Sequence, residues 1–151
     1  MPDDMDSSLA SAPMSPVCVV DDDPGIRDSL RFLLEDAGYV VELIADGSAL
    51  IALLRADPRP RVVLLDRMMT RLDGIETLRQ LQDDPARQQA VIIFMTARHD
   101  SLDPETRRLM ERTTFTSVTK PFDLDTLLAA VELACERLAE RLAQDPRGAV
   151  L

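Results

Sequence analysis

Five short apolar runs alternate along the chain with stretches whose apolar residues recur at helical spacing. The runs predict buried strands at residues 17–20, 40–44, 62–65, 91–95 and 115–118. Each run is followed by a predicted helix with one apolar face. Strands that alternate with helices form a parallel sheet that is covered on both faces. Because such crossovers are right-handed, the expected fold class is α/β, a doubly wound sandwich.

Composition and local signals set the expected extent of the folded part. Residues 1–15 are small, polar and proline-containing, which predicts a flexible N-terminal tail. A single folded domain is predicted over residues 16–143, and a short C-terminal tail over residues 144–151. A chain of 151 residues has room for one domain of ordinary size. We expect no helix-turn-helix after residue 142.

Charge and cysteine content exclude several classes of function. Acidic residues number 27 against 17 basic ones, and the net charge of −10 disfavours binding to nucleic acid or to an anionic membrane. Two cysteines, Cys18 and Cys135, and one histidine, His99, cannot form a disulfide framework or a His/Cys metal cluster. Both cysteines occupy apolar positions, so we expect free thiols in a reducing compartment. The chain shows no secretory signal and no membrane-spanning apolar run, so we predict a cytoplasmic location.

Polar side chains follow four of the predicted strands, at the point where each strand ends. Asp21 and Asp22 follow the first strand, Asp66 the third, Thr96 the fourth and Lys120 the fifth. The carboxyl ends of parallel strands meet at one edge of a sheet, where ligands bind. Clustered carboxylates form an all-oxygen site that suits Mg²⁺. Together with a hydroxyl and an ammonium group, they predict phosphoryl chemistry.

Each of these residues also has an ordinary structural interpretation. The aspartates after the first strand could form a solvated turn, Asp66 could cap a loop, and Thr96 could begin a helix. Lys120 is different, because it is the only lysine among 17 basic residues. A compact ammonium differs from a guanidinium in reach and geometry, which indicates a chemical role. The joint arrangement at four strand ends is more specific than any one residue.

Four segments carry these strand ends, namely VCVVDDDPGIRDSLRFLLEDAGY, VVLLDRMMTRLDGIETL, IIFMTA and VTKPF. In this order they resemble the receiver domain of response regulators in two-component signalling. The resemblance covers about residues 17–138, nearly all of the predicted folded part. It implies a single flavodoxin-like domain with a five-stranded parallel sheet of order 2-1-3-4-5.

The resemblance also implies a role for each residue at the strand ends. Asp66 would be the phosphoacceptor. Asp21, Asp22, Asp66 and the backbone carbonyl of Met68 would hold Mg²⁺. Thr96 would donate a hydrogen bond to the phosphoryl group, and Lys120 would pair with its oxygens. Mg²⁺ and Lys120 would neutralise the repulsion between a carboxylate and an anionic phosphoryl donor.

Some positions depart from the family's usual pattern. Thr70 stands where the family usually has proline, so we expect a less rigid loop after the phosphoacceptor. Arg67 either contacts the phosphoryl group or its donor, or points into solvent. Ser117 takes the place of the usual aromatic switch residue, so that relay is predicted to be weak or absent. Phe115 lies two residues earlier and is expected on the same strand face.

Two other functions remain open alternatives. A haloacid-dehalogenase-like phosphatase would use the Asp-x-Asp at residues 21–23, but its expected hydroxyl is missing where Pro24-Gly25-Ile26 stands. A pseudo-receiver would bind partners without being phosphorylated, and the intact set of five polar residues argues against it.

The expected partners follow from the leading hypothesis. The phosphoryl donor would be a sensor histidine kinase or a histidine phosphotransfer protein, and the target a downstream protein effector. We expect no direct contact with nucleic acid and none with a membrane. A homodimer stays open. Phosphorylation adds roughly −1.5 to −2 charge at one spot, which would alter the docking surface.

Overall fold

The structure is a computed structural model that describes residues 15–97 and 102–144. The tails predicted over residues 1–15 and 144–151 therefore lie outside the described part of the chain, except for residues 15 and 144. The last helix continues to Gln144, one residue beyond the boundary expected for the folded domain.

The described residues form one five-stranded parallel sheet with strand order β2-β1-β3-β4-β5. This is the order expected from the sequence, and it confirms the doubly wound fold. β1, β3 and β4 are almost wholly buried, whereas β2 and β5 form the partly exposed edges. The strands are β1 (Val17–Val20), β2 (Val41–Ile44), β3 (Arg61–Asp66), β4 (Ala90–Ala97) and β5 (Thr116–Lys120).

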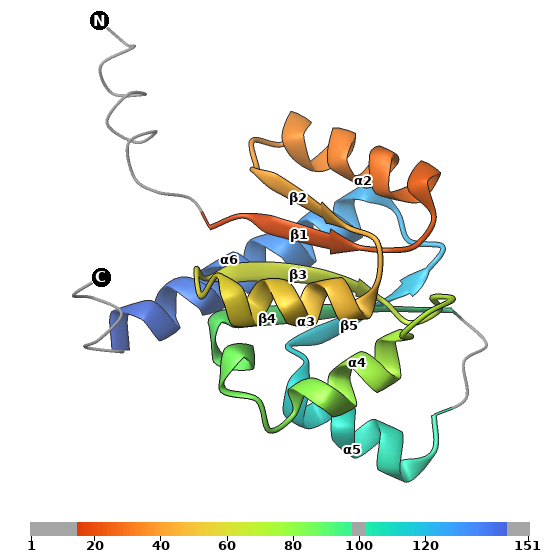
Figure 1. The fold of residues 1–151 in the computed structure, drawn as a ribbon. Coiled ribbons are helices and arrows are strands. Elements are labelled where there is room, and N and C mark those ends of the chain that lie inside the picture. The colour runs from red at the N-terminus through yellow and green to blue at the C-terminus, as the bar shows by residue number, and fades with distance from the viewer. Residues whose placement is uncertain (1–14, 98–101, 145–151) are drawn as a thin grey trace, which may run out of the picture.

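Helices cover both faces of the sheet, as Figure 1 shows. α2 and α6 pack on one face, and α3, α4 and α5 pack on the other. The helices in the described ranges are α2 (Pro24–Asp36), α3 (Gly47–Ala56), α4 (Gly74–Leu81), α5 (Pro104–Thr113) and α6 (Leu124–Gln144), with a 3₁₀ turn η1 (Pro85–Gln89) before β4.

The apolar core is divided by the sheet into two layers. Successive residues of a strand point to opposite faces. Val62 and Leu64 of β3 accordingly pack towards α2 and α6, whereas Val63 and Leu65 pack towards α3 and α4. Because both faces of β3 are buried, its backbone is held firmly up to its carboxyl end. That end is where the predicted site lies.

Aspartate side chains cap the helices at the same edge of the sheet. The Asp23 carboxylate accepts hydrogen bonds from the backbone N–H groups of Gly25 and Ile26, with Pro24 at the first position of α2. Gly38 ends this segment with a φ of 99°, a conformation that favours glycine. Capping satisfies the free N–H groups of a helix start. Some of the aspartates therefore have a structural role, because they fix where the helices begin.

Phe115 does not share a strand face with Ser117, so that prediction is wrong. β5 begins only at Thr116, and the Phe115 ring packs against the core layer beneath α2 and α6. Arg137 of α6 lies 4.9 Å from the centre of this ring. Val118 belongs to the same layer, so strand alternation directs Ser117 to the opposite face.

Leu124 is the one leucine at the start of α6 that lies apart from the core. Its residue surface is 42% exposed, whereas Leu127, Val131 and Leu138 are buried. Leu124 is the first residue of α6, and the buried residues of this helix begin only at Leu127.

Cys18 and Cys135 are free thiols, as predicted. Burial is the main cause that raises the pKa of Cys18 to about 12, so this thiol stays protonated and unreactive. None of the helices in the described ranges has the length and apolar character needed to span a membrane.

Candidate functional site

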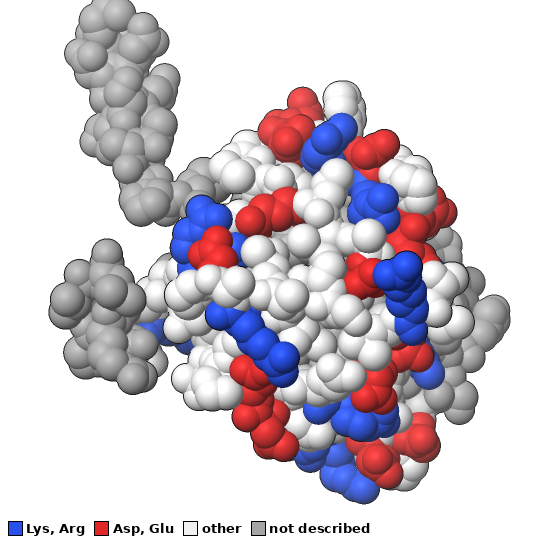
Figure 2. Space-filling view, viewed as in Figure 1, with Lys and Arg blue, Asp and Glu red and all other residues white. Residues whose placement is uncertain are grey.

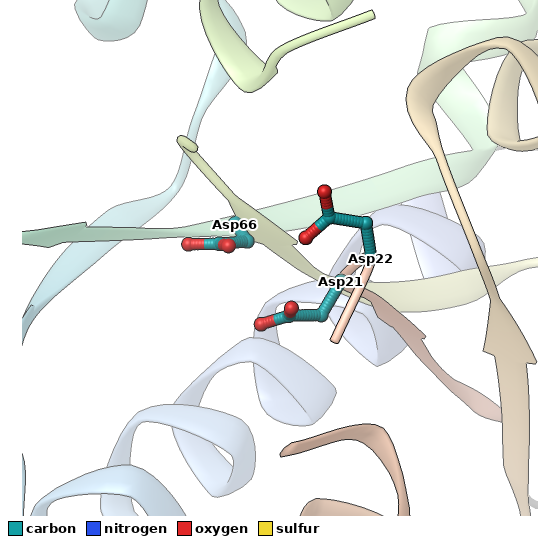
Figure 3. Close-up of side chains that lie close together, drawn as sticks. All are labelled: Asp21, Asp22 and Asp66. Atoms are coloured by element: carbon teal, nitrogen blue, oxygen red, sulfur yellow. The ribbon is translucent and has the colours of Figure 1, made fainter. Parts of the chain in front are cut away.

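Three carboxylates meet at the carboxyl edge of the sheet. Asp66 is the last residue of β3, and Asp21 and Asp22 directly follow β1. β1 and β3 are adjacent parallel strands, so their ends lie side by side. One oxygen from each carboxylate lies within 4.8 Å of the others, and Figure 3 shows the three side chains gathered at this edge. The convergence expected from the sequence is therefore present.

Lys120 completes the cluster from the end of β5. Its Nζ donates a hydrogen bond to Oδ1 of Asp66 at 3.0 Å and lies 3.5 Å from Oδ2 of Asp21. β4 lies between β5 and β3, so the lysine reaches across the end of a neighbouring strand. The long, flexible side chain is what makes this contact possible.

Thr96 lies near Asp66 through the strand register, and Met68 lies near it along the chain. Asp66 is in register with Met95 of β4, and Thr96 is the next residue of that strand. Thr96 is almost buried. Met68 follows Asp66 in the loop, and its side chain is mostly exposed. The predicted roles of the Thr96 hydroxyl and the Met68 carbonyl remain predictions.

Burial and charge act in opposite directions on Asp66. Burial is the main influence that raises its pKa, and the neighbouring charge of Asp21 adds to the effect. The hydrogen bond and charge of Lys120, and a hydrogen bond from the Met68 backbone, lower the pKa but do not fully compensate. Burial lowers the pKa of Lys120, but Asp66 and Asp21 more than offset it, so the net shift is upward. Lys120 is therefore a permanent cation.

The donor set fits a hard divalent cation. All three convergent side chains are carboxylates, and Mg²⁺ prefers oxygen ligands. Within the described part of the chain, Lys120 is the one cationic side chain that forms an ion pair with these carboxylates. The carboxylates therefore keep an excess of negative charge, which a divalent cation would neutralise.

Several contacts that support the acidic loop were not anticipated from the sequence. The Asp23 N–H donates to Oδ1 of Asp21 at 2.9 Å, and Nη1 of Arg27 donates to the Asp21 carbonyl at 2.7 Å. The Thr70 N–H donates to Oδ2 of Asp22 at 2.8 Å. The residue pattern does not predict these bonds, because two of the three donors are backbone N–H groups. Thr70, which was expected to make the loop less rigid, is therefore hydrogen-bonded to Asp22 through its backbone.

Gly74 was also missed, although it begins the helix that follows the site. Its N–H donates to the Arg67 carbonyl at 2.8 Å. A Cβ atom at Gly74 would lie 2.5 Å from the Asp66 carbonyl oxygen and 2.8 Å from the Arg67 Cα. Glycine is required here because the start of α4 passes directly against the backbone of Asp66. The glycine after Asp73 in the sequence was the available signal.

Arg67 does not simply point into solvent. The residue is partly buried, and its Nη1 atom is inaccessible to solvent. Its charge contributes, after the hydrogen bonds from Thr106 and the charge of Arg79, to lowering the pKa of Asp103 at the start of α5. The solvent alternative is therefore wrong, and contact with a phosphoryl group stays a prediction.

A pocket of about 700 Å³ lies beside the cluster. It opens between the first turns of α2 and the segment that follows β5, and its lining includes Asp23, Ile26, Lys120 and Phe122. Lys120 therefore borders both the carboxylates and this open space.

Comparison with known proteins identifies relatives of the chain. The family described as the response regulator receiver domain matches residues 17–132. Response regulator MprA of Mycolicibacterium vanbaalenii is 40% identical over 121 residues, which cover 80% of this chain and 50% of that protein. MprA of Mycobacterium ulcerans is 39% identical over the same length. The chain thus spans about half the length of these curated relatives.

Solved structures share the fold. A CheY-like response regulator receiver domain protein from Methanospirillum hungatei matches with a TM-score of 0.71 and 32% identity, covering 86% of this chain and 98% of that one. Chemotaxis protein CheY4 of Vibrio cholerae matches with a TM-score of 0.67 and 27% identity, covering 81% and 99%. With its 2-1-3-4-5 sheet and its acidic cluster, the chain belongs to the response regulator receiver domain family of two-component signalling.

Proposed function

We propose that Asp66 is the phosphoacceptor of this receiver domain. The observation that carries this assignment is a buried carboxylate at the end of β3, held between the ammonium of Lys120 and two further aspartates. Membership of the family implies a kinase as partner. The donor would be the phosphohistidine of a sensor histidine kinase or of a histidine phosphotransfer protein.

In the transfer, a carboxylate oxygen of Asp66 attacks the phosphorus atom. The new O–P bond forms as the P–N bond to the donor imidazole breaks, and the freed nitrogen takes a proton. Lys120 pairs with the phosphoryl oxygens, and the Thr96 hydroxyl donates a hydrogen bond to one of them. When bound by Asp21, Asp22, Asp66 and the Met68 carbonyl, Mg²⁺ would neutralise the charge that otherwise repels the donor.

The chain is a phosphoacceptor and not an enzyme that turns over a separate substrate. It assists its own phosphorylation and dephosphorylation, because the residues that stabilise the transferred group are its own. The match to the receiver family does not favour a haloacid-dehalogenase-like phosphatase. The acidic cluster and its paired lysine do not favour a pseudo-receiver.

The proposed output is docking onto a protein effector. The net charge of −10 supports this, because DNA phosphates would repel such a chain. We therefore propose that this chain makes no direct contact with nucleic acid. We also propose that it acts in the cytoplasm. A homodimer remains compatible with this proposal.

The decisive experiment replaces Asp66 by asparagine. Wild-type protein is treated with Mg²⁺ and acetyl phosphate, and intact mass spectrometry is expected to show one added phosphoryl group. Asp66→Asn should show none, because the amide is not a nucleophile at this site. Asp83→Asn is the matched control, since Asp83 is an exposed aspartate in the turn after α4. Full labelling of Asp66→Asn would overturn the assignment.

A further inference from the structure

Arginine side chains gather at the amino end of β4, at the edge of the sheet opposite to the three carboxylates. Arg141 lies in the last turn of α6, and its Nη1 donates to the Ala90 carbonyl at 3.1 Å. Arg87 lies in η1, three residues before Ala90, and its Nη1 donates to the Arg112 carbonyl at 3.3 Å. Arg137 precedes Arg141 by one turn of α6. We call Arg87, Arg137 and Arg141 the arginine cluster.

The positive charge of this cluster is poorly neutralised. Within the described ranges, Arg87 and Arg141 bond to backbone carbonyls and not to carboxylates. Arg137 pairs with the exposed Glu140 at 3.6 Å. Nε of Arg87 is inaccessible to solvent and has no hydrogen-bond partner. Burial, and after it the charges of Arg137 and Arg87, lower the pKa of Arg141, so nearby carboxylates do not offset this repulsion.

The chain enters the sheet at the same edge. The carbonyl of Pro16, directly before β1, accepts a hydrogen bond from the Val62 N–H of β3. Val62 is in register with Val91, the residue after Ala90 in β4. Pro16 therefore lies two strand spacings from the start of β4, roughly 10 Å. Figure 1 shows the start of β1 and the end of α6 on the same side of the molecule.

The segment before Pro16 carries the charge that the arginine cluster lacks. Residues 1–14 lie outside the described ranges, and they include Asp3, Asp4 and Asp6 but no basic residue. Asp6 is ten residues before Pro16, and a flexible linker of that length spans roughly 16–19 Å on average. This length suffices to cross from β1 to β4. The tether also holds the aspartates at an effective concentration of roughly millimolar, so individually weak ion pairs can form together.

We propose that residues 1–14 dock on the arginine cluster, with the carboxylates of Asp3, Asp4 and Asp6 as ligands of its guanidinium groups. Guanidinium donors bind carboxylates through charge-assisted hydrogen bonds. Nucleic acid is a less suitable occupant, because a chain of net charge −10 repels a separate polyanion and no tether compensates. The docking surface lies at the edge opposite to Asp66, so this inference does not depend on phosphorylation.

A spin label on the acidic segment tests the docking in the full-length chain. Ser8→Cys provides the attachment site in a Cys135→Ala background, since Cys18 is buried. At low ionic strength the label should broaden the NMR amide signals of Ala90 and Arg141. The Glu76 amide at the start of α4, at the opposite edge of the sheet, is the internal control.

The tether alone brings the label near this edge, so the decisive measure is the broadening that charge removal abolishes. In Arg87→Gln/Arg141→Gln, the broadening at Ala90 should fall to the level that the wild type shows in 1 M NaCl, where screening reaches about 3 Å. Arg31→Gln/Arg107→Gln is the matched control, because both arginines are exposed and lie on other helices. This variant should retain the full effect.

The acidic side of the contact is tested separately. Asp3→Asn/Asp4→Asn/Asp6→Asn should lose the same broadening while the arginine cluster stays intact. This arm decides the matter even if the double arginine variant does not fold, which thermal unfolding shows. Broadening that is equal in the wild type and in this triple variant would overturn the proposal.

Two further measurements test the other possible occupants. Spin-labelled chain is mixed with a ¹⁵N-labelled chain that has no spin label. Broadening at Ala90 as strong as within one chain would assign the cluster to a second copy and overturn docking within the chain. Duplex DNA is titrated at physiological salt, and shifts at Ala90 and Arg141 that saturate would assign the cluster to nucleic acid. We expect neither result.

Discussion

As the proposed phosphoacceptor, Asp66 must be ionised although its side chain is buried, and these two conditions conflict. A nucleophilic carboxylate must be ionised, but burial at the end of β3 favours its neutral form and raises its pKa. Lys120 at 3.0 Å counteracts this and keeps a positive charge beside the carboxylate. Under the proposed function, the same ammonium would pair with a transferred phosphoryl group, so Lys120 would serve the site before and after the transfer.

The backbone of Asp66 is confined as closely as its side chain. We predict that Gly74→Ala lowers the free energy of unfolding by roughly 1–3 kcal/mol, the usual cost of overpacking. The added methyl group would meet the Asp66 carbonyl oxygen at 2.5 Å, so the start of α4 or the end of β3 must shift. Phosphorylation of Asp66 should slow for the same reason. Urea unfolding and the rate of labelling by acetyl phosphate measure the two effects.

Gly25→Ala is the matched control for this substitution. Gly25 also lies in the first turn of a helix at this edge of the sheet, but an added Cβ would meet only a side-chain oxygen of Asp23, at 3.3 Å. The change in its unfolding free energy should be much smaller. Equal stability of Gly74→Ala and the wild type would contradict the close approach at Gly74.

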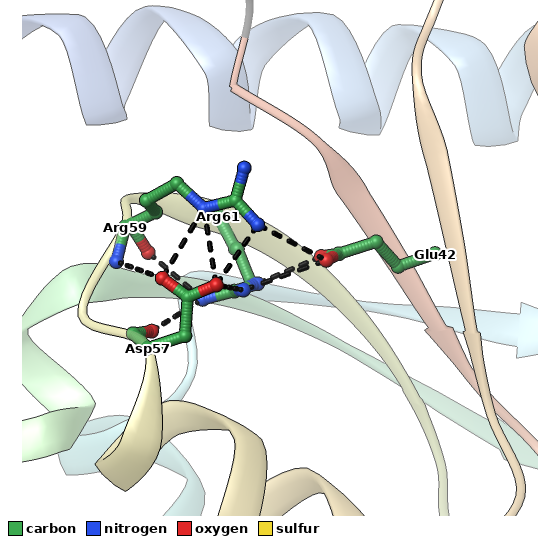
Figure 4. A network of polar contacts seen from close by, with 4 residues as sticks. All are labelled: Glu42, Asp57, Arg59 and Arg61. Atoms are coloured by element: carbon green, nitrogen blue, oxygen red, sulfur yellow. Dashed lines mark hydrogen bonds and ion pairs between the residues drawn. The ribbon is translucent and has the colours of Figure 1, made fainter.

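At the scale of elements, a polar network anchors the edge strand β2 at the opposite end of the sheet. Arg61, the first residue of β3, is fully buried and donates from Nε to Oε1 of Glu42 at 2.7 Å. It also bonds to the Asp57 carboxylate at 3.1 Å and to the Asp57 carbonyl at 2.7 Å (Figure 4). One guanidinium thereby joins β2, β3 and the loop after α3. Its planar set of donors suits several acceptors at once.

We predict that Arg61→Ala lowers the free energy of unfolding by roughly 3 kcal/mol, because two carboxylates and the carbonyls of Asp57 and Arg59 lose their shared partner. Asp66 should still accept phosphate at temperatures well below unfolding, since the network lies at the far end of β3. Differential scanning calorimetry and acetyl phosphate labelling test the two parts. Arg59→Ala is the control, because the Arg59 side chain is 65% exposed and its ion pairs should contribute about 1 kcal/mol or less. If Arg61→Ala is folded but is not labelled, the Arg61 network and the Asp66 site are not independent, which would contradict this prediction.

At the scale of the whole molecule, charged side chains of both signs lie close to one another on the face drawn in Figure 2. Figure 2 shows acidic and basic side chains interspersed on the face that carries α3 and α4. At the strand ends, by contrast, three carboxylates converge. A cation bound there would reduce the repulsion among these three carboxylates.

We predict that Mg²⁺ stabilises the whole domain. A ligand that binds only the folded state at 100 times its Kd adds about 2.7 kcal/mol to the free energy of unfolding. Asp22→Ala should lose most of this gain, whereas Asp83→Ala should keep it. Calorimetry with MgCl₂, and with NaCl at equal ionic strength, separates specific binding from screening. The same melting temperature in both salts for the wild type would count against a cation site.

The sequence by itself determined the element order, the helix starts and the residues at the strand ends. These features depend on local physics, because strand alternation, helical spacing and capping act within a few residues. Asp23 before Pro24 is a local signal for a helix start and Gly38 a local signal for a helix end, and α2 lies between them. The ends of parallel strands must share an edge, so the convergence of Asp66 and Lys120 also followed from the pattern.

Tertiary structure alone decided which backbone groups meet at that edge. The bond from Thr70 to Asp22 joins residues 48 apart, and the contact of Gly74 with the Asp66 carbonyl depends on the path of α4. The direction of Phe115 depends on where β5 begins. Such contacts are set by strand register and by the approach of one backbone to another. Every residue except proline carries the same backbone N–H and C=O groups, so residue types alone do not encode which of them pair.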